Sequence, residues 1–395
     1  MPTTFHVRAL TSTIRVELDD SLSADERDHI QSQWSDLISE NGDEPSLTVR
    51  GSIATADAAA RTPGEMFIRD QKTIRAASPT ELADTLSSEV TLGAIGALRG
   101  EALMLHAAAA ALDDGRVVAL VGPSGRGKTT AAQALGSVYA YVTDETLAIL
   151  PDGGVLAYPK PLGFGERPER KLHRAASELG LRTAARDGLR LGAIALLDRR
   201  PGIERPYVES VPLAEALPLL IPETSFLADL EHPLSTLAET IVANGGVRRV
   251  VYTEAETLPA LIDEILATVD DRRPSFTSVA DQSQRDCDCA KGSAADADPV
   301  ADAGVGTGAP SRYRRTDHTD ALLIDDGLLV LRPAQATMLE GVGPVIWLAA
   351  DATTEHELVD AALRQLPEPP EGVDATEVVR TALEQLVDAR LLTRR

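Results

Sequence analysis

The sequence contains little cysteine, few aromatic residues and a marked shortage of positive charge. Its 395 residues include two cysteines and 3% aromatic residues, with 38 Lys and Arg against 61 Asp and Glu. Cys287 and Cys289 are separated by one residue, which excludes a disulfide framework and a four-cysteine zinc site. The formal net charge of −23 argues against partners such as nucleic acids and anionic membranes, which attract basic surfaces.

No segment has the length and apolarity that a membrane-spanning helix requires. The longest apolar run, Ala102 to Leu112, contains His106 and is shorter than the roughly 20 residues that such a helix needs. Met1 to Asp20 contains acidic residues and no apolar core, unlike a signal peptide. We therefore expect a cytoplasmic protein.

Composition divides the chain into a large and a small part. Residues 271–312 are rich in Ser, Ala, Asp, Gly and Pro and nearly lack large apolar side chains, which predicts a disordered linker. Before it, strand-like and helix-like runs alternate, as in an α/β fold. We expect an N-terminal α+β region at 1–95, packed on an α/β core at 96–270, and a small domain at 313–395.

One glycine-rich motif points to a phosphate site. Gly122 to Thr129 fits G-x-x-x-x-G-K-[ST], between the apolar strand Val117 to Val121 and a helix-prone run from Thr130 to Leu135. Backbone amides in such a P-loop hold the phosphates of ATP, the lysine neutralises them and the hydroxyl ligates Mg²⁺. A turn without ligand would not require this strand–loop–helix context. The expected ATP-binding residues are Gly122, Pro123, Ser124, Gly125, Arg126, Gly127, Lys128, Thr129 and Thr130.

An acidic pair follows the motif at short range. Asp144 and Glu145 come fifteen residues after Thr129, so a short helix and a returning strand would bring them beside the phosphate loop. An aspartate there can accept the proton of an attacking hydroxyl or hold Mg²⁺. The alternative is a solvated acidic pair at the end of a strand.

Three segments together resemble the C-terminal catalytic domain of HPr kinase/phosphorylase. They are Leu103 to Ala107, the motif Gly122 to Thr129, and Thr143 to Glu145. Similarity is greater to the HPr-kinase-like proteins encoded with peptide natural-product pathways. The resemblance implies catalytic roles for Asp144 as base, for Lys128 and for His106 near the phosphates, with Thr129 and Glu145 as metal ligands. On the residues alone, a lone histidine on an alanine-rich strand such as His106 is more often a core residue, and only the resemblance raises the active-site interpretation to equal weight.

The chain also departs from this family. Glu145 stands where the family has a second aspartate, and the family signature E-I-R-G-L-G is missing. The nearest stretch, Leu189 to Ile194, lacks its glutamate. The resemblance therefore implies a kinase without the phosphorylase activity.

The C-terminal part resembles PqqD, the winged-helix-like RiPP recognition element. Its marks are the hairpin turn Asp325-Asp326-Gly327, the segments Gly341 to Trp347 and Thr354 to Leu358, and the ending Leu383 to Leu392. The resemblance implies a leader peptide that pairs as an added strand, near Leu328–Arg332 and the helix Val378–Leu386. A generic winged-helix module is the alternative, although acidic residues in its last helix would repel DNA.

Taken together, these features predict a kinase that uses ATP and Mg²⁺ to phosphorylate a Ser or Thr hydroxyl of a ribosomally made precursor peptide. An ATP-binding protein that delivers the precursor without catalysing transfer is the alternative. A kinase for a small metabolite would leave the C-terminal module unexplained. The sequence defines neither the acceptor nor an oligomeric state.

Overall fold

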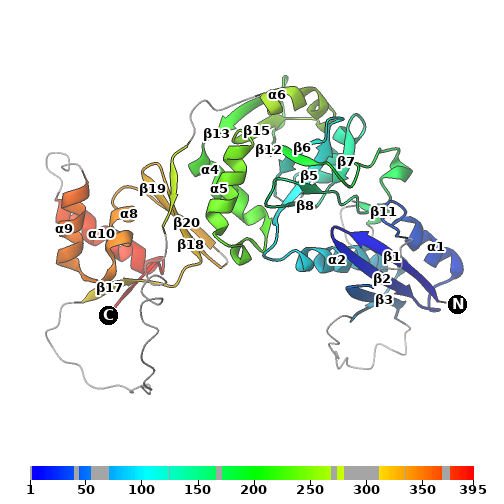
Figure 1. The fold of residues 1–395 in the computed structure, drawn as a ribbon, viewed down its shortest axis with the longest axis horizontal. Coiled ribbons are helices and arrows are strands. Elements are labelled where there is room, and N and C mark those ends of the chain that lie inside the picture. The colour runs from blue at the N-terminus through cyan, green and yellow to red at the C-terminus, as the bar shows by residue number, and fades with distance from the viewer. Residues whose placement is uncertain are drawn as a thin grey trace, which may run out of the picture. The chain divides into compact units, whose positions relative to one another are not determined.

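The computed structural model describes residues 2–39, 44–54, 71–123, 125–165, 171–267, 274–279, 311–333, 335–366 and 374–395. It has a mixed α/β fold with several sheets (Figure 1). The chain divides into a large unit, Met1–Glu231 with Thr236–Arg273, and a small unit, His232–Ser235 with Pro274–Arg395. No helix in the described ranges is long and apolar enough to cross a membrane.

The large unit begins with a four-stranded sheet in the order β1-β2-β3-β4. β1 and β2 are antiparallel, whereas β2–β3 and β3–β4 are parallel. One hydrophobic core joins this sheet to Met104 and Ala148 of the next sheet, so the two sheets share a buried interior. The elements are β1 (Thr3–Ala9), β2 (Ser12–Leu18), α1 (Ala24–Ser32), β3 (Leu47–Ile53), β4 (Gln71–Ala76) and α2 (Pro79–Ala97).

A nine-stranded sheet forms the centre of the large unit. Its main order is β13-β15-β12-β6-β5-β8-β9, with β7 and β14 also paired to β5. β6, β12 and β15 are parallel neighbours, and the other pairs are antiparallel. The strands are β5 (Leu103–Ala111), β6 (Arg116–Val121), β7 (Ala140–Thr143), β8 (Thr146–Ile149), β9 (Val155–Leu156), β12 (Arg190–Arg199), β13 (Tyr207–Val211), β14 (Thr224–Ser225) and β15 (Val247–Tyr252).

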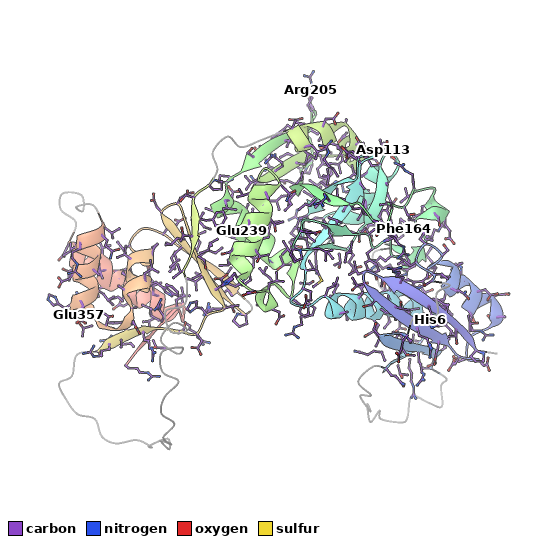
Figure 2. All side chains as sticks on the ribbon, in the orientation of Figure 1. His6, Asp113, Phe164, Arg205, Glu239 and Glu357 are labelled. Carbon is purple, nitrogen blue, oxygen red and sulfur yellow. The ribbon has the colours of Figure 1, made fainter. Side chains whose placement is uncertain are left out.

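The turn between β5 and β6 confirms the first predicted hairpin. Leu112 accepts a hydrogen bond from Gly115, whose φ of 85° suits glycine, and Asp113 lies at this turn (Figure 2). α3 (Lys128–Gly136) follows β6 and buries Ala131 and Leu135 against that strand's face. The remaining elements are β10 (Leu162–Phe164), β11 (Leu172–Arg174), η3 (Ser177–Leu179), α4 (Leu213–Leu220), η4 (Ile221–Glu223), η5 (Leu227–Asp229), α5 (Pro233–Ala243), η6 (Ala255–Leu261) and α6 (Ile262–Ala267).

The small unit contains two sheets and a group of helices. One sheet has the order β16-β18-β19-β20 and the other β21-β17-β22. The turn Asp325-Asp326 joins β18 to β19, as predicted. The elements are β16 (Phe276–Ser278), β17 (Arg312–Arg315), β18 (Asp320–Ile324), β19 (Gly327–Arg332), β20 (Gln335–Leu339), α8 (Gly343–Ala349), β21 (Asp351–Thr354), α9 (Glu355–Gln365), α10 (Ala375–Asp388) and β22 (Leu392–Arg394).

Two details of the small unit correct the sequence-based expectations. Residues 274–279 fall inside the predicted linker, yet β16 pairs with β18, because Phe276–Ser278 supplies backbone groups to that edge. Ser311 and Arg312, at the end of the predicted linker 271–312, are also described, and Arg312 begins β17. The other residues of that linker, including both cysteines, lie outside the described residues. β19, the expected docking edge at Leu328–Arg332, is paired on both sides, so in the described part of this sheet the edge strands are β16 and β20.

Candidate functional site

The glycine-rich motif forms the connection between β6 and α3. Gly125 and Gly127 have φ values of 77° and 91°, a region that disfavours side chains with a Cβ atom. The N-terminus of α3 has no side-chain cap, and no acidic residue lies in its first turn. Its partial positive charge is therefore available to an anion. Ser124 lies outside the described residues, and Pro123, Gly125, Arg126 and Thr130 are exposed.

Lys128 is a half-buried lysine at the first position of α3. Its Nζ donates a 2.5 Å hydrogen bond to the carbonyl of Gly122, at the start of the same loop. Burial lowers the pKa of Lys128, while the negative charges of Glu223, Glu145 and Asp144 oppose that shift. The ammonium group thus lies within the field of the acidic pair, and Glu223 of η4 is an additional neighbour that sequence reasoning missed.

Asp144 follows β7 directly and is buried, with 6% of its surface exposed. Its Oδ2 accepts a 2.8 Å hydrogen bond from Oγ1 of Thr129. Its Oδ1 accepts a 3.0 Å hydrogen bond from the hydroxyl of Tyr141. Burial and the charge of Asp144 raise the pKa of Tyr141, so this phenol stays protonated and remains a donor. The carboxylate is therefore oriented from two elements, α3 and β7.

Glu145 is paired with a lysine that the sequence did not single out. Nζ of Lys160 lies 2.7 Å from Oε2 of Glu145 and 3.7 Å from Oδ1 of Asp144. Burial would lower the pKa of Lys160, but the two carboxylates outweigh it and raise that pKa. Burial likewise opposes the charge of Glu145, yet Lys160 lowers the pKa of this carboxyl below its ordinary value. Lys160 and Glu145 are thus both ionised at neutral pH.

His106 lies on β5, which pairs with β8, the strand that begins directly after the acidic pair. In this ladder His106 lies opposite Thr146, and the amide of Ala107 donates a 3.0 Å hydrogen bond to the carbonyl of Glu145. Nε2 of His106 is 2.8 Å from Oγ of Ser225 in β14. The half-buried imidazole is therefore held by a hydroxyl beside the acidic pair, instead of being packed as an apolar core residue.

The geometry brings four of the predicted site residues, Lys128, Thr129, Asp144 and Glu145, into one cluster with Tyr141 and Lys160. We call Lys128, Thr129, Tyr141, Asp144, Glu145 and Lys160 the acid–lysine cluster. Its oxygen donors fit Mg²⁺, which takes one or two protein oxygens and completes its shell with phosphates and water. In the described ranges, no group of three or more His, Cys, Asp and Glu could hold a metal by itself. A metal here would therefore depend on the nucleotide for further ligands.

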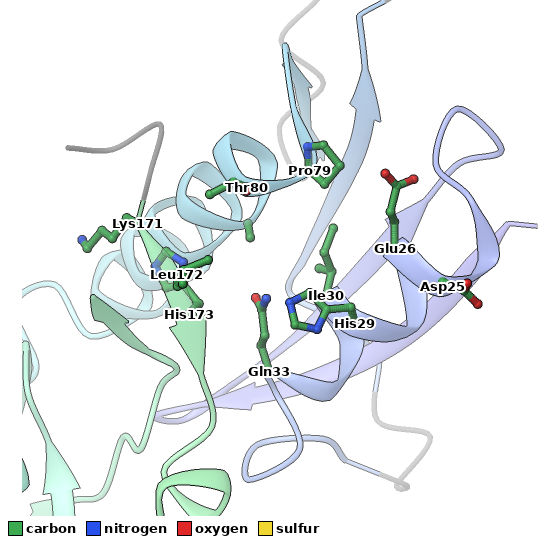
Figure 3. A pocket seen from close by; sticks show the side chains of 11 residues that line it. Asp25, Glu26, His29, Ile30, Gln33, Pro79, Thr80, Lys171, Leu172 and His173 are labelled. Carbon is green, nitrogen blue, oxygen red and sulfur yellow. The ribbon is translucent and has the colours of Figure 1, made fainter. Parts of the chain in front are cut away.

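A separate pocket of about 250 Å³ opens between α1, α2 and β11 (Figure 3). Its lining includes His29, Gln33 and His173, and none of the acid–lysine cluster. Nε2 of His173 is 3.4 Å from Asp84, while burial and the charge of Lys160 lower the pKa of His173 to about 4. His173 is consequently neutral at pH 7.

Comparison with models of protein families gives no match for this chain, and no curated protein matches it in sequence. Its function is therefore inferred from the chemistry of the acid–lysine cluster and from the edges of the small unit.

Proposed function

We propose that the protein is an HPr-kinase-like P-loop kinase which transfers the γ-phosphoryl group of ATP to a Ser or Thr hydroxyl of a ribosomally made precursor peptide. The observation that carries this proposal is the 2.8 Å hydrogen bond between Thr129 and Asp144. It joins the hydroxyl of the phosphate-binding motif to the acid expected to act as base. An isolated glycine-rich turn would have no need of such a contact.

The parts of the cluster divide the chemistry among themselves. The amides of the loop and the N-terminus of α3 bind phosphate oxygens, and Lys128 neutralises their charge after leaving the carbonyl of Gly122. Mg²⁺ held by Thr129 and Asp144 would neutralise further phosphate charge. Asp144 accepts the proton of the attacking hydroxyl. At the same time the hydroxyl oxygen of the acceptor forms a bond to the γ-phosphorus, and the bond from that phosphorus to the leaving ADP breaks. Tyr141 keeps the carboxylate of Asp144 in place.

His106 has a supporting part in this proposal. Its imidazole is held at 2.8 Å from Ser225, on the strand that runs beside the acidic pair. A histidine in this position can donate a hydrogen bond to a phosphate oxygen or to the acceptor. The contact with Ser225 orients the ring for that purpose.

The small unit supplies the proposed peptide-binding function. We propose a PqqD-like domain in residues 313–395, with a winged-helix-like arrangement of its strands and helices. β20 offers unpaired backbone groups to an extended segment, and a leader peptide can add to them as a further strand. Binding of the leader raises the effective concentration of the acceptor hydroxyl at the large unit.

The test combines the protein with ATP, Mg²⁺ and the precursor peptide encoded beside its gene, and follows the peptide by mass spectrometry. We expect the addition of one phosphate with the wild type and none with Lys128→Ala. Lys72→Ala is the matched control, because Lys72 is an exposed lysine that pairs with Glu89. An unmodified peptide with the wild type, or full phosphorylation by Lys128→Ala, would refute the proposal.

One observation favours a second candidate, an ATP-binding protein that delivers the precursor without catalysing transfer. The carboxylate of Glu145 is already engaged by Lys160, so the acidic pair has fewer free oxygens for metal than two unpaired carboxylates would have. Such a delivery protein would retain its effect on precursor modification when Asp144 is replaced by Asn, whereas a kinase would lose turnover.

A further inference from the structure

Lys160 is a buried cation between two carboxylates. Its side chain is 5% exposed, against 47% for Lys72 and 39% for Lys171. Nζ lies 2.7 Å from Glu145, 3.7 Å from Asp144 and 3.4 Å from the carbonyl of Pro161. Burying an ammonium group costs free energy unless the group is paired, and the two carboxylates and the carbonyl supply the partners that Lys160 needs.

The carboxylates of Asp144 and Glu145 have different kinds of partner. Asp144 accepts hydroxyl hydrogen bonds on both oxygens, from Thr129 and Tyr141. Glu145 has its contact with Lys160 on Oε2, and the amide of Glu145 bonds Thr143. Only Thr129, among these partners, also belongs to the phosphate-binding motif. A cation that approaches from the nucleotide side therefore meets Asp144 and Thr129, while Glu145 is occupied by Lys160.

We propose that Lys160 is a positioning residue that acts as a built-in cation of the acidic pair, in place of a second divalent metal ion. Its ammonium group holds Glu145 and reduces the net charge of the two carboxylates from −2 to −1. The pair consequently has little affinity for a divalent cation in the absence of nucleotide. This inference rests on the proposed function for the role of Asp144 as the remaining metal ligand.

The test measures the binding of Mn²⁺ alone, followed by the electron paramagnetic resonance of the free ion. Removing the buried positive charge in Lys160→Met should tighten Mn²⁺ binding about tenfold or more, since two uncompensated carboxylates then face the ion. Lys160→Arg should bind as weakly as the wild type, because the charge is retained. Lys171→Met, which removes a partly exposed lysine whose charge also reaches Glu145, is the matched control and should change little.

Equal affinities of Lys160→Met and the wild type for Mn²⁺ would overturn the inference. Lys160→Met by itself risks unfolding, because it removes the cation beside the buried carboxylate of Asp144 and leaves the half-exposed Glu145 without its ion pair. The same comparison is therefore made between Glu145→Gln and the double variant Glu145→Gln/Lys160→Met, which has the wild-type net charge of the cluster. Removing Lys160 in this background should again tighten Mn²⁺ binding about tenfold, and identical affinities would contradict the proposed role.

The two proposals fail in different ways. Calorimetry with ATP on the wild type tests the proposed function, and no uptake of ATP would refute that function. The Mn²⁺ comparison contains no nucleotide and decides the role of Lys160 in either case. A wild type that binds ATP, together with a Lys160→Met variant that gains no Mn²⁺ affinity, would overturn the inference about Lys160 alone.

Discussion

Oγ1 of Thr129 donates a 2.8 Å hydrogen bond to Oδ2 of Asp144, although the two residues are fifteen positions apart in the chain. The contact joins the first turn of α3, which follows β6 and the glycine-rich loop, to the residue directly after β7. It places an acid against the hydroxyl that follows Lys128.

Asp144→Asn should separate catalysis from binding. The amide retains an oxygen that can accept from Thr129 but cannot take the proton of the attacking hydroxyl. We expect phosphoryl transfer to fall by roughly 10²–10⁴-fold, while ATP affinity changes only a few-fold. Single-turnover transfer and calorimetry measure the two effects. Asp152→Asn, at an exposed turn, is the control, and full activity of Asp144→Asn would contradict its role as base.

Lys128→Met should weaken nucleotide binding without unfolding the protein. The lysine is half-buried and bonds only the Gly122 carbonyl among the hydrogen bonds described for its Nζ, so the apolar methionine can occupy the same space. We expect ATP affinity to fall at least about tenfold, because a charge on the β- and γ-phosphates is lost. Calorimetry measures the affinity, and circular dichroism checks the fold. Unchanged ATP binding would show that this loop does not hold the triphosphate.

His173 should make the stability of the large unit fall between neutral and mildly acidic pH. Burial lowers its pKa from 6.5 to about 4, so the unfolded chain binds a proton in this range and the folded chain does not. The free energy of unfolding therefore rises with pH between these values, and at about pH 5 the histidine costs about 2 kcal/mol relative to pH 7.

Urea unfolding of the wild type and of His173→Gln at both pH values isolates this effect from that of the carboxylates. The variant should lose about 2 kcal/mol less between pH 7 and pH 5 than the wild type does. His29→Gln, which alters an exposed histidine of the same pocket, is the control. Equal losses for the wild type and His173→Gln would exclude a neutral buried imidazole.

Proline substitutions in β20 should show whether the leader pairs with this edge. Successive amides of an edge strand point alternately toward the sheet and outward, so Ala336→Pro and Thr337→Pro remove one amide of each kind. One variant should keep the wild-type melting temperature and lose leader affinity about tenfold. The other should lower the melting temperature. Fluorescence polarisation of a labelled leader measures affinity, and undiminished binding by both variants would place the leader elsewhere.

The residues of the chain alone predicted those features that depend on near neighbours. The two Asp-Gly turns, at Asp114-Gly115 and Asp326-Gly327, and the apolar runs beside them predicted the β5–β6 and β18–β19 hairpins. Turn geometry and strand alternation are local properties, which a few consecutive residues decide. The motif Gly122 to Thr129 predicted a strand–loop–helix connection for the same reason, and β6 and α3 flank it as expected.

Tertiary structure decided which of these residues meet. Lys160 is one of five lysines, and its neighbours Pro159 and Pro161 give no sign that its ammonium group lies beside Glu145. Likewise, β16 pairs with β18 and makes it an inner strand of the sheet. β20 pairs with the edge of β19 at which the leader peptide was expected to dock. Burial, charge pairing and strand order join residues that are distant in the chain, so they emerge only when the sheets have assembled.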